Sequence, residues 1–310
     1  MADDKKGWLY SDVYTRAASA QNRLPRTSLF KFGTFKDVID GAIRLLAQWM
    51  IAGFLFAFLL ILLFDSIERH DDQSFLILGE VIRAICVTIS VFLSSKIFSD
   101  IEITDLGLKF QRQAVKDFLA GFAFVGCIVM FLFVVFRGLG WLTIENTVWQ
   151  TYSFQSIILS TLLMLIVFIL VGWSEELLSR GFHLRLISKG LNRPLGIILS
   201  AFIFSYLHRD NLDITLGGLV FIFLFGIILA FAFLRTGQLW LAIGLHAGWD
   251  FFVVVFWGTP ISDLNIFHFM EINFRFFPLP GFILEFFELC VIAVFIYFYT
   301  SRRQAKFEDW

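Results

Sequence analysis

The sequence predicts an all-α membrane protein, a polytopic helical bundle with about eight transmembrane helices. Of its 310 residues, 58% are hydrophobic and only 16% are charged, whereas a soluble domain carries about 25% charged residues. The excess of apolar side chains therefore needs a lipid environment. The apolar residues also gather in segments of about 20 residues, the length that an α-helix needs to cross the hydrocarbon core.

Individual segments support this prediction to different degrees. The second is the weakest because Glu80 and Arg83 interrupt it, and we expect these two residues to form a structural ion pair on one helical face. The fifth is short and ends at His208, a pattern that is tolerated where the polar end lines a cavity in the protein. Residues 177–193 predict a continuation of the fourth helix, ended by a turn before Pro194. The expected spans are 43–64, 75–98, 118–136, 155–176, 195–208, 216–234, 239–257 and 279–299.

The distribution of basic residues predicts the topology. Residues 1–42 are rich in Lys and Arg, whereas the loop at 65–72 is mostly acidic. Because cytoplasmic loops are enriched in Lys and Arg, we expect the N-terminus in the cytoplasm, and eight spans return the C-terminus to the same side of the cell (inner) membrane. Within the N-terminal segment, residues 28–48 are expected to form an interfacial helix or to remain disordered. The predicted parts are a basic cytoplasmic segment at 1–42, a transmembrane domain at 43–300 with a motif-bearing core at 155–257, and a short cytoplasmic tail at 301–310.

The most informative segment is Trp-Ser-Glu-Glu-Leu-Leu-Ser-Arg-Gly at residues 173–181, where the fourth apolar run ends. Ionisable side chains at hydrocarbon depth are costly and usually functional. On a helix, Glu176 and Arg180 lie one turn apart, so we expect Arg180 to neutralise Glu176. Glu175 points in another direction and is expected to lack a cationic partner, which suits a general base. A buried ion pair beside a spectator glutamate is the alternative.

Two later segments carry polar residues at helical spacing. Phe204 and His208 share one face of the fifth span, and His246 and Asp250 lie one turn apart in the seventh. Taken alone, a histidine at a helix end is most often an interfacial or hydrogen-bonded residue. The seventh span also contains a Gly-x-x-x-Gly pattern, which permits close helix packing. Beside an intramembrane histidine, that pattern indicates a helix pressed against the site and narrowing its cavity.

Other polar residues give weaker signals. Glu285 and Glu288 in the last span are expected to snorkel or to contact another helix. His183 and His268 are expected in or near loops, without a catalytic role. The three cysteines lie far apart in apolar segments, so neither a disulfide framework nor a metal-ligand pattern is expected.

The motifs Glu-Glu-x-x-x-Arg, Phe-x-x-x-His and His-x-x-x-Asp occur in this order on separate apolar segments. Together they resemble the CPBP family, which comprises CAAX prenyl endopeptidases and bacteriocin-processing enzymes and is also called the Abi family. The resemblance covers roughly residues 160–257. It implies an eight-helix intramembrane protease in which a glutamate and a histidine activate water, while a second histidine and an Asn or Asp bind the scissile carbonyl.

Transferred motif by motif, the resemblance makes Glu175 the base and gives His208 the task of holding or activating water. His246 and Asp250 would then polarise the peptide oxygen. The best-known prenyl endopeptidases have Asn at the last position, and an ionised carboxylate there would repel an oxyanion. Asp250 is therefore expected to be protonated, hydrogen-bonded to His246, or in another role. The candidate site comprises Glu175, Glu176, His208, His246 and Asp250 as catalytic residues, with Arg180 and Phe204 as supporting residues.

These side chains also raise the alternative of a metallopeptidase. Glu175, His208 and His246 are the alternative ligands for zinc or another divalent metal. The chain lacks His-Glu-x-x-His, and the candidate ligands lie on three different helices. We therefore favour glutamate chemistry with neither a metal nor another cofactor.

The expected partners are a peptide or protein substrate, lipidated or not, and membrane lipids. The sequence does not choose among CAAX-like processing, bacteriocin maturation and self-immunity. Nucleic-acid binding has no support, because no basic face is predicted outside short loops. The alternative function is a non-catalytic membrane scaffold or transport partner that retains the polar cluster, although a transporter more often shows inverted repeats.

Overall fold

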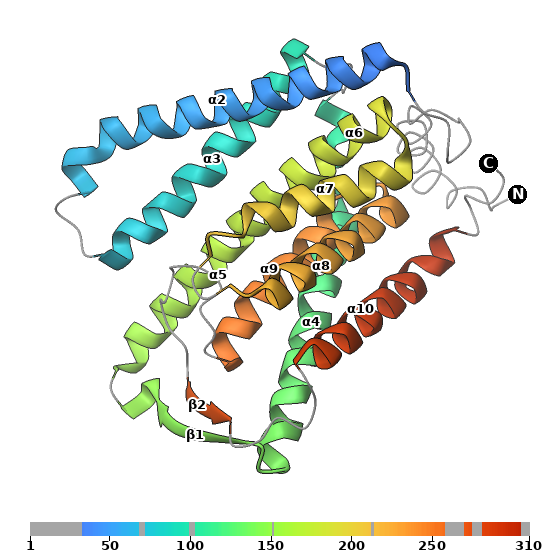
Figure 1. Ribbon diagram of the computed structural model, residues 1–310. Helices are drawn as coiled ribbons and strands as arrows, with labels where there is room; N and C mark the ends of the chain where they lie inside the picture. Colours follow the sequence, from blue (N-terminus) through green and yellow to red (C-terminus); the bar gives the residue numbers. More distant parts are fainter. Residues whose placement is uncertain are drawn as a thin grey trace, which may run out of the picture.

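The structure, a computed structural model, describes residues 33–67, 72–98, 103–150, 152–211, 214–257, 270–274 and 281–304. Over these ranges it is a bundle of helices with one two-stranded sheet at one end (Figure 1), which confirms the predicted all-α polytopic class. The α-helices are α2 (Phe35–Ile67), α3 (Asp72–Phe98), α4 (Arg112–Gly138), α5 (Phe154–Glu176), α6 (Leu184–Gly190), α7 (Arg193–Leu207), α8 (Leu216–Thr236), α9 (Trp240–Trp257) and α10 (Gly281–Gln304). The short helical segments are η1 (Ile103–Leu106), η2 (Val148–Gln150) and η3 (Leu177–His183).

The helices match the predicted spans. Within the described residues, seven are long and apolar enough to cross a membrane, and α7 is a shorter apolar helix in the place of the fifth predicted span. The chain is therefore a multi-pass membrane protein. Large apolar side chains such as Phe54, Phe131 and Phe298 are exposed on the outer helix faces, where lipid would cover them. Among the described residues, helix α2 begins at Phe35, before the predicted start of the first span at residue 43.

Local sequence explains where several helices begin and end. The side chain of Asn192 accepts a hydrogen bond from the backbone N–H of Leu195, and Pro194 lies in the first turn of α7. This arrangement satisfies a helix N-terminus and confirms the predicted turn before Pro194. At the end of α8, Gly237 adopts a left-handed conformation with φ of 65°, which a glycine adopts at no steric cost.

The fourth span continues as helix through Gly190, as predicted, but its middle is not regular. Residues Leu177–His183 form the π-helical segment η3, directly after Glu175 and Glu176. Such segments are rare and often occur at functional sites. His183 lies within η3 and is fully buried, and its Nε2 accepts a hydrogen bond from Trp49 at 3.2 Å. The prediction that His183 lies in or near a loop was therefore wrong, and His268 lies outside the described residues.

Helix α9 runs through the middle of the bundle and packs closely on α4 (Figure 1). A Cβ on Gly244 would collide with the carbonyl oxygen of Phe118, and a Cβ on Gly248 would lie 2.9 Å from that of Phe122. The two glycines therefore let the backbones of α4 and α9 approach. They face α4 and not the polar cluster, so the prediction that this pair narrows the cavity at the site was wrong.

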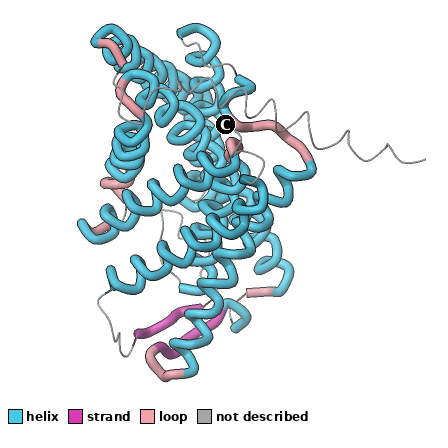
Figure 2. The backbone as a smooth tube through the Cα atoms, turned by 90° about the vertical axis from the view of Figure 1, so that its right-hand side faces the viewer, coloured by secondary structure: helices cyan, strands magenta, loops and turns pink. Residues whose placement is uncertain are grey.

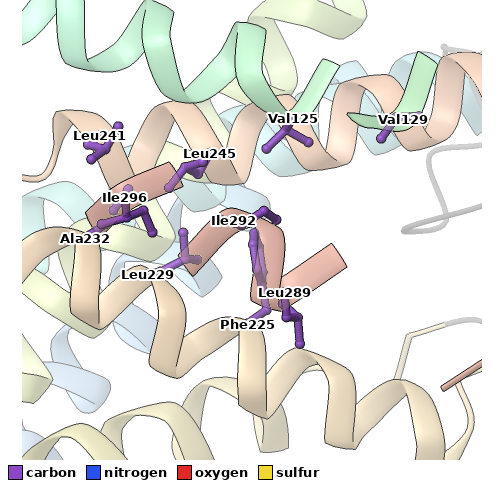
Figure 3. Close-up of a cluster of buried hydrophobic side chains, with 11 residues drawn as sticks. Val125, Val129, Phe225, Leu229, Ala232, Leu241, Leu245, Leu289, Ile292 and Ile296 are labelled. Atoms are coloured by element: carbon purple, nitrogen blue, oxygen red, sulfur yellow. The ribbon is translucent and has the colours of Figure 1, made fainter. Parts of the chain in front are cut away.

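Two hydrophobic clusters hold the central helices in place. The first joins α4, α8, α9 and α10 through residues such as Val125, Leu229, Leu245 and Ile292 (Figure 3). The second surrounds η3 and joins it to α3, α8 and α9. The helices that carry the candidate site are thus fixed by buried apolar contacts on both sides of it.

A small antiparallel sheet, which the sequence did not predict, closes one end of the bundle. Strand β1 (Leu142–Thr147) pairs with β2 (Met270–Phe274), with Leu142 opposite Phe274. The pair lies at the lower end of the bundle (Figure 2), while α2 begins and α10 ends at the other end (Figure 1). The number of crossings and the cytoplasmic location of the termini stay predictions.

Candidate active site

The three predicted motifs meet in the interior of the bundle. Glu175 lies near the end of α5, His208 directly follows α7, and His246 lies within α9. Oε2 of Glu175 is 3.5 Å from Nε2 of His208 and 3.7 Å from Nε2 of His246. The two imidazoles, from the end of α7 and from α9, thus direct their Nε2 atoms at a single carboxylate oxygen of α5.

Arg83 from α3 completes this group. Its Nη1 donates a hydrogen bond to Oε1 of Glu175 at 2.8 Å, and its Nε donates to Oε2 of Glu80 at 2.8 Å. The predicted Glu80–Arg83 pair is confirmed, but it also extends into the site. The expectation that Glu175 lacks a cationic partner was wrong, because helical spacing reveals partners on the same helix and not those from a neighbouring one. A charged residue inside an apolar span was the signal that could have identified Arg83.

A second layer lies beneath Glu175 and is almost fully buried. Nη1 of Arg180 donates to Oε1 of Glu176 at 2.7 Å, which confirms the predicted pair. The same oxygen accepts a hydrogen bond from Nδ1 of His246 at 2.8 Å. Nη2 of Arg180 also donates to the carbonyl oxygen of Gly226 in α8. The carboxylate of Glu176 therefore holds the Nδ1 edge of the His246 ring. Buried charged groups need such hydrogen-bonded partners.

Hydrogen bonding defines which nitrogen of each histidine faces the centre. Nδ1 of His208 lies 2.7 Å from the carbonyl oxygen of Phe204, and a carbonyl only accepts, so Nδ1 carries a proton. Nε2 of each ring then faces Glu175. Oδ2 of Asp250 lies 3.5 Å from Nε2 of His246, which places Asp250 beside the imidazole.

Phe204 supports the site through its ring. The guanidinium carbon of Arg180 lies 4.3 Å from the ring centroid, a cation–π distance. The His208 ring is 4.7 Å away, and the His246 ring meets it edge-on at 5.7 Å. One aromatic side chain therefore positions both imidazoles and the buried cation.

A cavity of about 270 Å³ opens onto these residues. Its walls include Glu175, His208, His246 and Asp250 together with Arg83, whereas Glu176 and Arg180 lie behind the wall. The Arg83 side chain is 34% exposed and that of His246 only 5%, so His246 lies deeper in the bundle than Arg83. Asn211, which follows α7, also lines it, and the sequence motifs did not indicate this residue.

The arrangement of the polar side chains bears on the metallopeptidase alternative. No group of three or more His, Cys, Asp and Glu side chains in these ranges has an arrangement that could hold a metal ion. The imidazole nitrogens of His246 instead face the carboxylates of Glu176 and Asp250. Glutamate chemistry without a metal stays a prediction.

Comparison with known proteins supports the motif assignment. Residues 157–252 match the model of the Rce1-like family, whose description is type II CAAX prenyl endopeptidase. Searches of curated proteins and of solved structures give no match. The matched range contains Glu175, His208, His246 and Asp250. The match confirms the resemblance to the CPBP family over residues 157–252, which lie within a multi-pass membrane protein and are similar to the Rce1-like type II CAAX prenyl endopeptidases.

Proposed function

We propose that this chain is an intramembrane endopeptidase in which Glu175 and His208 activate a water molecule while His246 stabilises the oxyanion. One observation carries the proposal. Nε2 of His208 and Nε2 of His246 lie within 3.7 Å of Oε2 of Glu175, at the wall of a cavity of about 270 Å³. A nucleophilic water held there would touch a base and two imidazoles at once, which is the geometry that general acid–base catalysis requires.

Glu175 is proposed to move the proton. Arg83 donates to Oε1, which keeps the carboxylate ionised and leaves Oε2 to accept a proton. The water oxygen attacks the carbonyl carbon of the substrate as its proton passes to Oε2. The carbon–nitrogen bond then breaks, and the leaving nitrogen takes that proton.

His208 is proposed to orient the water. Its Nδ1–H is bound to the Phe204 carbonyl, so in the neutral ring Nε2 accepts a hydrogen bond. Water between Glu175 and His208 can thus donate one hydrogen to each. This arrangement directs the oxygen lone pair away from both side chains and towards the substrate.

His246 is proposed to face the substrate carbonyl. Because its Nδ1–H is bound to Glu176, a second donor at Nε2 requires the doubly protonated ring. Glu176 on one side and Asp250 on the other stabilise that positive charge. In this arrangement Asp250 acts on the imidazolium and does not itself face the oxyanion, which removes the repulsion expected from a carboxylate.

The substrate is proposed to be a peptide or protein cut close to the membrane surface. The matched family is described as a prenyl endopeptidase, so a prenylated C-terminal peptide is the first substrate to test. Bacteriocin precursors, as in peptide maturation or self-immunity, and membrane-anchored proteins come next. A glutamate mechanism without a metal is proposed for all of them.

The test is cleavage by purified full-length chain in lipid vesicles, followed by mass spectrometry. The three substrate classes are each offered to wild type, to Glu175→Gln and to Glu145→Gln, a control on strand β1. We expect wild type and Glu145→Gln to cut one class at the same site. Glu175→Gln is expected to be slower by about 100-fold or more. Equal cleavage by Glu175→Gln would overturn the proposal, and no cleavage by folded wild type would favour the scaffold alternative.

A further inference from the structure

A second cavity, of about 220 Å³, adjoins the candidate active site on the side away from Arg83. The two cavities share Phe204, His208, Asn211, His246 and Asp250 in their walls. From this shared wall the second cavity continues along α8 and α9 to α10. A group that enters it therefore starts beside the proposed catalytic histidines.

Most of this second cavity has aromatic and aliphatic walls. Phe221 and Phe225 from α8 and Trp249 from α9 line it, and the ring of Trp249 lies 4.9 Å from that of Phe221 and 5.6 Å from that of Phe225. Aromatic faces bind alkyl chains by burial and attract cations through their π-electrons. The walls thus suit a side chain with an apolar stem and a positive end.

One acidic side chain lies in the wall. Glu285 comes from α10 and lines the cavity. Glu288, one turn further along α10, is 6% exposed, and no cationic side chain among the described residues forms an ion pair with either glutamate. The expectation that these glutamates snorkel or contact another helix does not account for a carboxyl that opens into a cavity beside the active site.

We propose that this second cavity is a substrate subsite that binds a lysine or arginine side chain close to the scissile bond, with Glu285 binding its cationic end. The inference rests on the proposed endopeptidase function and specifies its substrate. The alkyl stem would pack on Phe221, Phe225 and Trp249, as the stems of Lys and Arg do on apolar surfaces. The charge of the substrate would then compensate a carboxylate that is otherwise costly to keep in an apolar wall.

The size and the charge of the cavity together favour this occupant. Its volume is below the roughly 300–1,000 Å³ of pockets for drug-sized ligands, so it accommodates one side chain and not a folded segment. A purely aliphatic group would pack on the apolar walls of the cavity but leave Glu285 without a cationic partner. An acidic side chain would add a repelling charge.

The first test measures specificity. A synthetic peptide mixture, randomised at the residues around the cleaved bond of a substrate that wild type cuts, is offered to wild type, Glu285→Gln and the control Glu145→Gln. We expect wild type and the control to prefer Lys or Arg over norleucine at one fixed position by roughly 30-fold or more, and Glu285→Gln to lose that preference. Cleavage with no basic preference, or with one that Glu285→Gln retains, overturns the subsite and leaves the peptidase function intact.

The second test needs no activity. Val253 lines the same cavity, and Val253→Cys is made in a chain whose native cysteines are replaced by alanine. The cysteine is modified with a cationic and with a neutral methanethiosulfonate of equal length. The ratio of the two rates is measured in the chain that keeps Glu285 and in the chain that carries Glu285→Gln. A cationic preference of roughly tenfold that disappears in Glu285→Gln supports the subsite, and equal ratios in the two chains contradict it. The native cysteines to be replaced are Cys86, Cys127 and Cys290.

Discussion

His246 and Glu176, 70 residues apart in the chain, face each other across 2.8 Å between Nδ1 and Oε1. This contact joins the two layers of the site. On the cavity side, Nε2 of His246 faces Glu175 and Asp250, and on the buried side Glu176 binds Arg180. Because Glu176 holds Nδ1 of the imidazole, it also determines where Nε2 meets a substrate.

The buried pair below His246 should dominate the stability of the site. Arg180→Met removes the cation from a pair whose side chains are at most 1% exposed and leaves Glu176 as a buried charge. We expect the free energy of unfolding to fall by about 3–5 kcal/mol, measured by denaturant titration in detergent. Arg209→Met is the matched control because Arg209 and Asp210 form an exposed pair, and its effect should stay below about 1 kcal/mol. Equal losses in the two variants would contradict the account.

Arg83 should act on the rate more than on substrate binding. Arg83→Gln removes the donor that holds Oε1 of Glu175, and we expect kcat to fall by roughly 100-fold because the base loses its orientation. Arg83→Lys should restore part of kcat, and Glu80→Gln should have a smaller effect because the contact with Glu175 remains. Peptide cleavage rates over a range of substrate concentrations measure this. An increase in KM with kcat unchanged would assign Arg83 to substrate binding instead.

The contact between α4 and α9 should tolerate no side chain at its centre. A Cβ on Gly244 would collide with the Phe118 carbonyl, so Gly244→Ala must separate the two backbones. We expect it to lower the free energy of unfolding by about 1–3 kcal/mol. Gly53→Ala in α2 is the control because no atom lies within 4 Å of its added carbon, and that change should be neutral or stabilising by up to about 1 kcal/mol. Thermal unfolding in detergent compares the two, and an unchanged midpoint for Gly244→Ala would contradict the packing described.

Removal of metal should leave cleavage unchanged. The proposed step needs only Glu175, His208 and His246 as proton-transfer and hydrogen-bonding groups. Wild type is treated with a strong chelator, dialysed and assayed on the peptide that it cuts. Activity that is lost on chelation and restored by zinc would overturn the glutamate mechanism in favour of a metallopeptidase.

Motif spacing predicted what lies along one helix and missed what lies between helices. The Glu176–Arg180 pair, the shared face of Phe204 and His208, and the turn before Pro194 follow from local geometry, and the structure contains all three. Arg83 was assigned only to its neighbour Glu80, because nothing in a sequence places α3 against α5.

Other features were missed for the same reason. The π-helical segment at Leu177–His183 depends on tertiary packing around it, since the same residues also read as regular helix. The pairing of β1 with β2 joins segments far apart in the chain, and the alternation of apolar and polar residues in Met270–Phe274 does not by itself identify the partner strand. Glu285 was expected to snorkel or to contact another helix, because its place in the wall of a cavity depends on α8 and α9.

The most direct test of the central claim is a double-mutant cycle on Glu175 and His208. Cleavage of one peptide is measured for wild type, Glu175→Gln, His208→Ala and the double variant, with folding of each confirmed by thermal unfolding. If both side chains act on the same water, each single change should abolish most of the rate, and the double variant should be little slower than Glu175→Gln alone. Two losses that multiply, or a His208→Ala variant that cleaves like wild type, would contradict the shared activation of water.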